Sequence, residues 1–172
     1  EGRFEKVGEI KNQSKVIIDY AHTPEALKTC ILNLKEQFPD KKVILLFGCG
    51  GNRDQNKRSK MGEIADNLSH KIYLTDDNPR YEKPNKIRKD IKKGIKRKKV
   101  IEISNRAKAI SYAIKDLNIG EILLVAGKGH EKTQDMGKRK INISDKKIIL
   151  DSIKTKNKNL SNNLKFEIIK EV

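Results

Sequence analysis

Tryptophan is absent from this 172-residue sequence, which contains only four tyrosines and four phenylalanines. Single-stranded nucleic acids stack their bases on aromatic side chains, so this shortage argues against a nucleic-acid-binding module. Acidic residues are also outnumbered, 23 to 39 basic ones, which gives a formal net charge of +16. An excess of this size favours a nucleic-acid partner. It is mostly lysine interleaved with asparagine and isoleucine, over residues 86–99 and 132–158, so we interpret it as a compositional bias and expect no nucleic acid as partner.

Long hydrophobic runs are missing as well. The longest apolar runs, such as residues 43–47 and 122–126, are far shorter than the roughly 20 residues that a membrane-spanning helix requires. The sequence also does not start with a basic segment followed by a hydrophobic block, as secretory signals do. We therefore expect no contact with a membrane and a cytoplasmic location.

Cysteine and histidine are scarce. Cys30 and Cys49 lie in apolar surroundings without C-x-x-C spacing, and we expect both to act as small buried hydrophobic residues. His22, His70 and His130 lack the spacing of a structural zinc site. The sequence therefore predicts no metal site formed by this chain alone.

Short apolar runs of strand length alternate with amphipathic segments of helical period. This alternation predicts one α/β domain with a Rossmann-like, mostly parallel sheet flanked by helices. A turn at Gly137 predicts a terminal hairpin, and Ser144 is suited to cap a last helix that runs to Ile153. The strands are expected at residues 15–20, 42–47, 71–75, 100–103 and 121–126.

The ends of the chain are expected to lie outside this domain. Residues 1–14 precede the first predicted strand and are interpreted as a linker. Residues 15–155 hold the alternating pattern, and residues 156–172 form a Lys/Asn-rich tail that we expect to fray.

Four polar loops follow the predicted strands. In a parallel sheet such loops converge at the carboxyl ends of the strands, where ligands bind. We therefore expect one shared rim. The loops are residues 19–24 (DYAHTP), 48–54 (GCGGNRD), 76–80 (DDNPR) and 127–131 (GKGHE).

The charged residues of these loops suit a small zwitterion. Arg53 and Arg80 can each grip a carboxylate with two hydrogen bonds, Asn78 can donate beside them, and Glu131 can accept from an ammonium group. The alternative is that both arginines are solvated surface charges. Neither a P-loop nor a dinucleotide-binding glycine pattern occurs in the sequence, so another domain would have to hold most of any ATP.

The four motifs together resemble a known family. In the order DYAHTP, FGCGGNRD, TDDNPR and VAGKGHE, they resemble the third domain of the Mur ligases, and within that family the diaminopimelate-adding enzymes. The resemblance covers residues 2–155. A sister ligase such as folylpolyglutamate synthetase is the alternative enzyme, although it would need a different motif at residues 77–80.

The resemblance implies a three-domain ligase of which only the third domain is present. The missing first domain would hold the UDP-sugar, and the missing central domain would hold most of the ATP and Mg²⁺. ATP would activate the D-glutamyl carboxylate of a UDP-muramoyl dipeptide, and the amine of meso-diaminopimelate would attack it. The partners are therefore these substrates and the chain's own N-terminal and central domains, and the fragment alone is expected to be inactive, with no catalytic residue.

The resemblance also implies site residues. Arg80 suits the second carboxylate of diaminopimelate, which lysine lacks, and so would select between these substrates. The residues implied in diaminopimelate binding are Arg53, Asp77, Asn78, Pro79, Arg80, Gly127 and Glu131.

A second group of residues is implied in contacts with the nucleotide. These are Arg3, Asp19 and His22. A purely local role is the alternative here, because Asp19 is able to cap the next turn and His22 to orient it. No role is assigned to Lys128 or His130.

Overall fold

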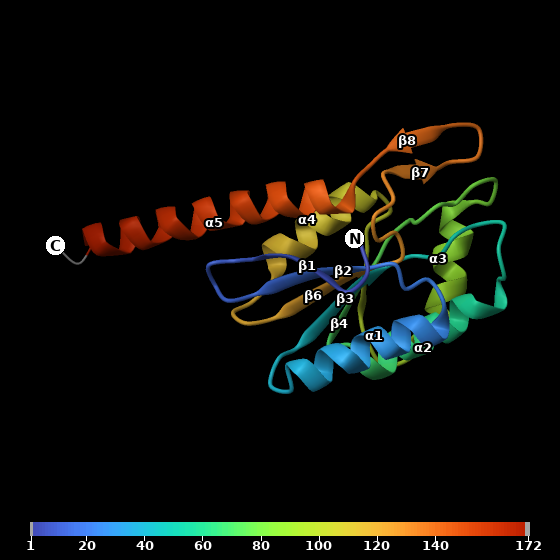
Figure 1. Cartoon of the computed structure of the whole chain (residues 1–172), viewed down its shortest axis with the longest axis horizontal. Coiled ribbons are helices and arrows are strands. Elements are labelled where there is room, and N and C mark those ends of the chain that lie inside the picture. Colours follow the sequence, from blue (N-terminus) through green and yellow to red (C-terminus); the bar gives the residue numbers. More distant parts are fainter. Residues whose placement is uncertain (1, 171–172) are drawn as a thin grey trace.

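The chain forms a six-stranded sheet between two layers of helices (Figure 1). The computed structural model describes the backbone of residues 2–170 and the side chains of residues 2–162. Strand order is β1-β2-β6-β3-β4-β5, and every neighbouring pair is parallel except β1 and β2. The strands are β1 (Glu5–Glu9), β2 (Lys15–Asp19), β3 (Val43–Phe47), β4 (Lys71–Leu74), β5 (Val100–Glu102) and β6 (Ile122–Ala126). This confirms the predicted fold class.

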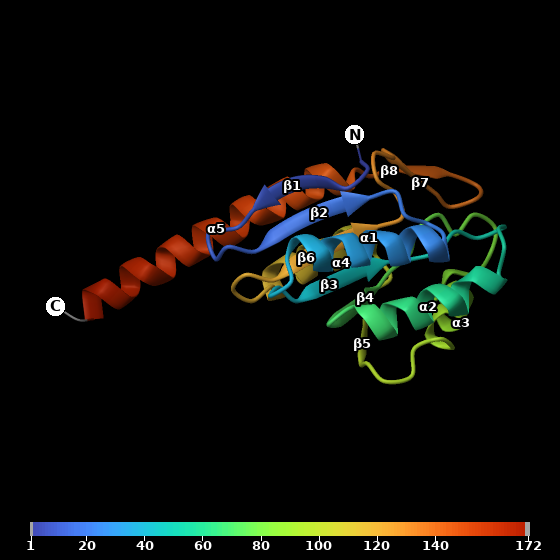
Figure 2. The same cartoon turned by 60° about the horizontal axis from the view of Figure 1, so that its bottom comes forward.

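The helices divide between the two faces of the sheet, as Figure 2 shows from a second side. One face carries α1 (Pro24–Gln37), α2 (Asn56–Leu68) and α3 (Pro84–Lys92), and the other carries α4 (Arg106–Asp116) and α5 (Asp145–Lys170). Each layer buries its own apolar cluster against the sheet.

The central strands are apolar throughout because both of their faces are covered. In β3, Leu45 and Phe47 belong to the cluster under α1–α3, whereas Ile44 and Leu46 belong to the cluster under α4 and α5. All four are at most 1% exposed. Burial of each such side chain contributes roughly 1.5–3 kcal/mol, so the two clusters fix the sheet between the helix layers.

Helix α1 begins as its sequence predicts. Thr23 accepts a hydrogen bond from the backbone N–H of Ala26 (3.2 Å), and Pro24 occupies the first turn, where a missing N–H does no harm. Leu27, Ile31 and Leu34 then recur on the buried face. The cap places the end of the preceding loop at the edge of the sheet.

Residues 1–14, expected as a linker, include the edge strand β1. It pairs antiparallel with β2, for instance Glu5 with Ile18, and Val7 packs on the cluster under α4 and α5. The expected linker is therefore largely part of the fold. The strand was hidden in the sequence because its five residues, EKVGE, include a single large apolar side chain, Val7, and an edge strand needs little apolar surface.

The last helix is longer than the sequence predicts. It continues past Ile153 to Lys170, although residues 156–172 were expected to fray. Its extension is anchored by Lys156, whose ammonium donates to three backbone carbonyls at the C-terminal end of α4. Residues 171–172 of the expected tail lie outside the described part of the chain. No helix in the described part is long and apolar enough to cross a membrane.

The predicted terminal hairpin is present beside the sheet. It consists of β7 (Thr133–Asp135) and β8 (Lys140–Asn142), which pair antiparallel around Gly137. It lies next to the first turn of α5 (Figure 1). The hairpin is joined to the loop after β4 by the backbone of Asp135, which bonds to Asn78 and Arg80.

Candidate functional site

The four polar loops meet at one cavity of about 470 Å³. It lies beyond the carboxyl ends of β2, β3, β4 and β6, where the parallel sheet brings the strand-to-helix connections together. Most of the residues singled out from the sequence line it, namely His22, Arg53, Asp77, Asn78, Arg80, Gly127 and Glu131. The expected convergence of the loops is confirmed, while the ligand contacts of these residues stay a prediction.

Three of the singled-out residues do not line the cavity. Pro79 lies behind it, and its carbonyl accepts a hydrogen bond from the N–H of Glu82 (3.1 Å). Arg3 is exposed, beside Gly2, which packs against Gly129 and His130. Asp19 is the third. Pro79 therefore shapes the turn around Arg80, and Arg3 lies at the rim without facing the cavity.

Asp19 makes two local hydrogen bonds. Its two carboxylate oxygens accept from the N–H groups of Phe4 (2.6 Å) and Ala21 (2.7 Å). The hydrogen bond from Phe4 joins the N-terminal segment to the end of β2, and the one from Ala21 stabilises the turn that leads to α1. The structural role weighed for Asp19 in the sequence is thus present.

Arg80 is held in place by backbone carbonyls. Its Nη1 donates to the carbonyl of Gly51 (2.8 Å) and, at 3.4 Å, to that of Asn78, while its Nε lies 3.7 Å from Oδ2 of Asp135. Its φ of 53° lies in the left-handed region, and its own N–H donates to the carbonyl of Asp135. The carbonyls orient the guanidinium and Asp135 forms a long ion pair with it, while Nη2 has no partner among the described residues and can donate to a ligand.

Arg53 is the second guanidinium at the cavity. It is exposed and makes no hydrogen bond or ion pair with any residue that the structure describes. Gly50 lies between it and Arg80: a Cβ there would be 3.8 Å from Cγ of Arg53 and 2.9 Å from Nη1 of Arg80. Lys57 and Lys60 also line the cavity. The arrangement favours a ligand that carries carboxylates.

Glu131 supplies a negative group opposite these cations. Its Oε2 accepts from Lys128 Nζ (2.7 Å) and Asn78 Nδ2 (3.0 Å). Burial raises the pKa of Glu131, but hydrogen bonds from these two side chains and the charge of Arg80 lower it by more, so the pKa lies below its usual value. The cavity therefore holds an ionised carboxylate that can accept from an ammonium group.

Lys128, to which the sequence assigned no role, is fully buried beneath the cavity. The signal was a lysine between two glycines directly after the apolar strand β6, a place where a solvated side chain is not expected. Its ammonium group donates to Asn78 on the loop after β4, to Glu131 on the same loop as Lys128, and to the carbonyl of Thr133 in β7. It joins the parts of the chain that carry Asn78 and Glu131.

Arg58 also escaped prediction. It is fully buried in α2 and pairs with Glu82 (2.9 Å) and Asp90 (3.2 Å), and it donates to the carbonyl of Gly50 (3.2 Å). Glu82 in turn accepts from the N–H of Asn52 (2.6 Å). These contacts connect the Gly-rich loop, which carries Arg53, to the segment that follows Arg80.

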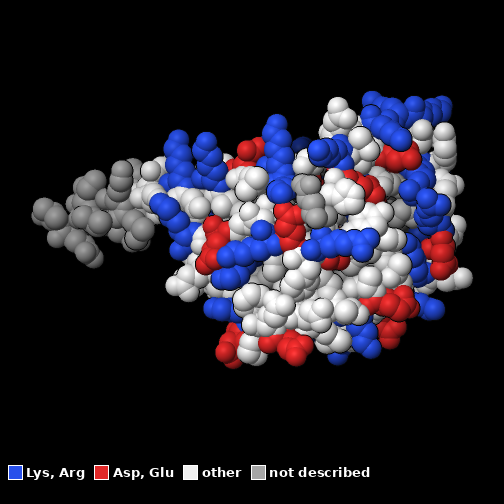
Figure 3. Space-filling view, in the orientation of Figure 1, with Lys and Arg blue, Asp and Glu red and all other residues white. Residues whose placement is uncertain are grey.

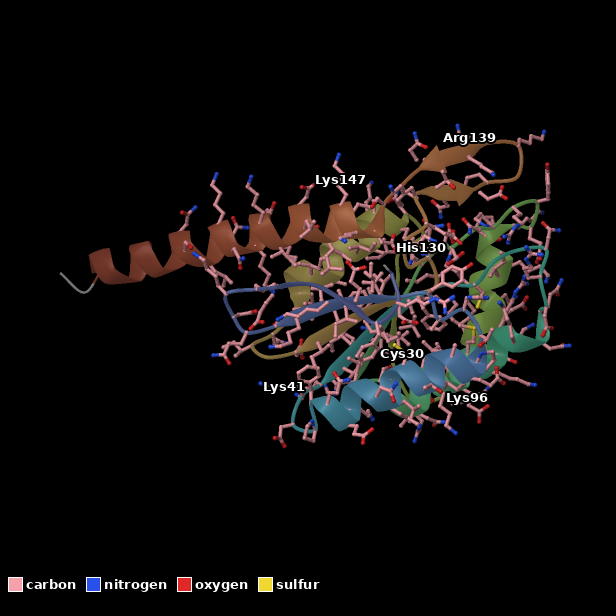
Figure 4. The ribbon with its side chains drawn as sticks, viewed as in Figure 1. Cys30, Lys41, Lys96, His130, Arg139 and Lys147 are labelled. Carbon is pink, nitrogen blue, oxygen red and sulfur yellow. The ribbon has the colours of Figure 1, made fainter. Side chains whose placement is uncertain are left out.

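The imidazoles at the rim make local contacts. His22 lines the cavity, its Nδ1 lies 2.8 Å from the carbonyl of Tyr20, and its own carbonyl accepts from Lys57. His130 is exposed, its ring centroid 5.9 Å from that of Tyr20. Figure 4 shows it between the hairpin and the body of the domain. The two rings therefore flank Tyr20 at one side of the rim.

The described residues offer no ligand set for a metal ion. No group of three His, Cys, Asp or Glu side chains among them is placed to hold one. Both cysteines are free and buried, as predicted, and burial raises the pKa of each thiol to about 12. They are thus inert thiols in the apolar core, where Figure 4 labels Cys30.

Comparison with known proteins identifies the family. The family model described as "Mur ligase, glutamate ligase domain" matches residues 2–129. The chain belongs to the Mur ligase family. This confirms the family resemblance seen in the four motifs.

Two relatives of this Mur ligase domain carry the name UDP-N-acetylmuramoyl-L-alanyl-D-glutamate–2,6-diaminopimelate ligase. One from Buchnera aphidicola subsp. Acyrthosiphon pisum is 49% identical over 151 residues, which is 87% of this chain and 30% of that protein. One from Rickettsia rickettsii is 45% identical over 154 residues, 89% of this chain and 31% of that protein. The chain thus spans less than a third of these relatives.

A solved structure of a ligase with the same name is similar to this domain throughout. It has a TM-score of 0.82 and 33% sequence identity, and the match covers 90% of this chain and 32% of that one. The match therefore extends over nine-tenths of this chain.

Proposed function

We propose that this Mur ligase domain binds meso-diaminopimelate for an ATP-dependent ligase that adds it to UDP-N-acetylmuramoyl-L-alanyl-D-glutamate. The observation that carries the proposal is the common cavity of Arg53, Arg80 and Glu131. Two cationic forks and one carboxylate in a space of about 470 Å³ complement a small amino acid with several charges. The names of the relatives support the same substrate.

The geometry suggests how the amino acid is held. A carboxylate can accept from Nη2 of Arg80, whose Nη1 is held by the carbonyls of Gly51 and Asn78, and the exposed Arg53 can donate to it from the other side of Gly50. Glu131 accepts from the neighbouring ammonium. With one end held in this way, the amine at the other end is free to face an activated carboxyl group.

Substrate selection follows from the charge of Arg80. Lysine has an amine but no carboxylate at its far end, so it would leave the guanidinium without its partner and place a second cation beside it. An unpaired charge in a closed site costs several kcal/mol, which corresponds to a large difference in reaction rate. The domain should therefore prefer diaminopimelate.

ATP and Mg²⁺ belong to this proposal as ligands held mainly by a central domain. The cavity is lined by side chains of both charges, with Arg53 and Arg80 beside Glu131, so this domain suits the carboxylates and the ammonium groups of the amino acid. When bound, Mg²⁺ would neutralise charge at the transferred phosphoryl group. Arg3, Asp19 and His22 would contact the nucleotide from this side. We expect the reaction to take place in the cytoplasm, where its nucleotide substrates occur.

A side-by-side assay of diaminopimelate and lysine tests the function. The complete ligase that carries this chain should add diaminopimelate and use lysine at least about 100-fold less efficiently. Arg80→Ala should raise the KM for diaminopimelate by about 10- to 100-fold, because charge-assisted hydrogen bonds of about 1.5–3 kcal/mol are lost, and leave the KM for ATP unchanged.

Arg139→Ala is the matched control, because Arg139 is an exposed arginine on the neighbouring hairpin (Figure 4). It should leave both constants unchanged. Equal use of lysine by the wild-type enzyme, or an unaltered KM for diaminopimelate in Arg80→Ala, would contradict the proposal. Addition of glutamate to a folate in the same assay would point to the sister ligase instead.

A further inference from the structure

Lys128 uses all of its hydrogen-bonding capacity inside the protein. Its side chain is fully buried, and Nζ donates to Asn78 Oδ1 (3.0 Å), Glu131 Oε2 (2.7 Å) and the carbonyl of Thr133 (2.7 Å). An ammonium group has three N–H donors, so none is left for a ligand. Lys128 also does not line the cavity. Any effect of Lys128 on a ligand must therefore pass through Asn78 and Glu131.

The first effect is on the direction of the Asn78 amide. Its Oδ1 accepts from Lys128 and from the N–H of Asp135 (2.9 Å), so both donors fix the oxygen on the side away from Glu131. The Nδ2 group must then point the other way, where it donates to Glu131 (3.0 Å). Without the ammonium, only the N–H of Asp135 would hold the oxygen in this direction, so the orientation of the amide would be less strictly fixed.

The second effect is on the two oxygens of Glu131. Lys128 and Asn78 both bind Oε2, whereas Oε1 has no hydrogen-bond partner among the described residues. The Glu131 side chain is 31% exposed, and the residue lines the cavity. One oxygen is therefore anchored and the other remains able to accept from a ligand ammonium.

We propose that Lys128 is a positioning residue for amino-acid recognition, which fixes the Asn78 donor and the Glu131 acceptor in the orientation that a zwitterion requires. This inference rests on the proposed function for the identity of the ligand. It assigns to Lys128 a role in the affinity for the amino acid and none in the binding of ATP.

The test uses Lys128→Met in the complete ligase, with Lys132→Met as the matched control. Methionine has a similar length and no charge, and Lys132 is an exposed lysine four residues further along the chain. The KM for the amino acid should rise between about tenfold and 100-fold in Lys128→Met, while the KM for ATP stays within about twofold. The control should match the wild type. An equal change in both constants, or no change, overturns the inference.

A double variant separates an effect on ligand recognition from a general loss of folding. Lys128→Met leaves the partly buried Glu131 carboxylate without its cation, whereas Lys128→Met/Glu131→Gln leaves no unpaired charge. If Lys128 acts through Glu131 and Asn78, its substitution should raise the KM much less in the Glu131→Gln background than in the wild type. Equal effects in both backgrounds would show that Lys128 acts elsewhere, for example only through the Thr133 carbonyl.

A final measurement needs no enzymatic activity. In NMR spectra of this chain, the side-chain amide protons of Asn78 should exchange slowly in the wild type and in Lys132→Met, and rapidly in Lys128→Met. Rapid exchange in the wild type, or slow exchange in Lys128→Met, would contradict the positioning role. If the wild-type ligase adds no diaminopimelate, the proposed function fails, while this measurement still decides the orientation of Asn78.

Discussion

Gly50 shows how a single residue can set the position of a charge. A Cβ at this place would lie 2.9 Å from Nη1 of Arg80, the flexible end of a side chain, whereas a Cβ at Gly51 would lie 1.9 Å from the carbonyl oxygen of Pro79, which is backbone. The first contact can be relieved by moving the guanidinium. The second can be relieved only by moving the chain.

Alanine substitutions at these two glycines should therefore behave differently. Gly50→Ala should keep the melting temperature of the wild type but raise the KM for diaminopimelate by about tenfold or more, because a displaced guanidinium loses its alignment. Gly51→Ala should lower the melting temperature, as overpacking of this kind costs about 1–3 kcal/mol or more. Thermal melts and kinetics of both variants check this. A loss of stability in Gly50→Ala with unchanged KM would refute the assignment.

The starting turns of α4 and α5 are joined by a buried ion pair. Arg106 Nη2 lies 2.7 Å from Oδ2 of Asp145 and also donates to the carbonyl of Ala126 at the end of β6 (3.1 Å). Its Nη1 has no hydrogen-bond partner and lies 4.0 Å from Oδ2 of Asp77. The pair connects the last helix with the strand end from which the cavity loop starts.

Removal of one partner should therefore destabilise the whole domain. Asp145→Asn leaves a fully buried guanidinium with only the more distant Asp77 as counter-charge, and breaking a buried pair of this kind costs about 3–5 kcal/mol. A loss of this size lowers the melting temperature of a domain of this length by roughly 10 °C. Asp151→Asn, at an exposed position of the same helix, is the control and should melt like the wild type. Equal melting of the two variants would show that the pair is not important for stability.

The sequence predicted the elements whose physical cause is local. The runs in β3 and β6 and the cap at Thr23 depend on neighbouring residues, and so they could be read without a structure. The strand β1 and the extension of α5 depend on distant partners. Lys156, for example, is one of many lysines in its segment, and only the carbonyls at the end of α4 distinguish it.

The residues at the cavity also divide into those that the local sequence predicts and those that depend on distant partners. Arg53, Arg80 and Glu131 could be selected because their loops all follow strands of one parallel sheet, and the cavity indeed contains them. Lys128 differs from other lysines only by its place between two glycines, and Arg58 has no such signal, because the partners of a buried cation are not visible in the sequence. Figure 3 shows many other lysines and arginines at the surface. Composition alone indicated solvated lysines and arginines.

At the scale of the whole molecule, ion pairs link the stability of the fold to pH. The hydrogen bond from Arg58 lowers the pKa of Glu82, and Lys93, together with Lys86 and Arg58, holds the pKa of Asp90 well below its usual value. Because these pKa values are lower in the folded state, the unfolded chain takes up protons first as the pH falls. The stabilisation is complete above the ordinary carboxylate pKa of about 4 and is lost below it.

The melting temperature should therefore be nearly constant between about pH 7 and 5 and fall steeply below about pH 4. Asp76 acts in the opposite direction, because burial raises its pKa more than Arg88 lowers it. Glu82→Gln should melt at a lower temperature at neutral pH and show a shallower acid dependence. Melts of both proteins across this range check the prediction. An identical slope for the variant would exclude Glu82 as a contributor.

The way in which Arg80 is seated has a practical consequence for anyone who handles this protein. The guanidinium of Arg80 is oriented by the carbonyls of Gly51 and Asn78 and has only a long ion pair with Asp135, and Arg53 beside it has no partner among the described residues. Small inorganic anions such as sulfate or phosphate can occupy such a fork. The buffer then becomes a competitor, and measured affinities for the amino acid will depend on which salt accompanies it.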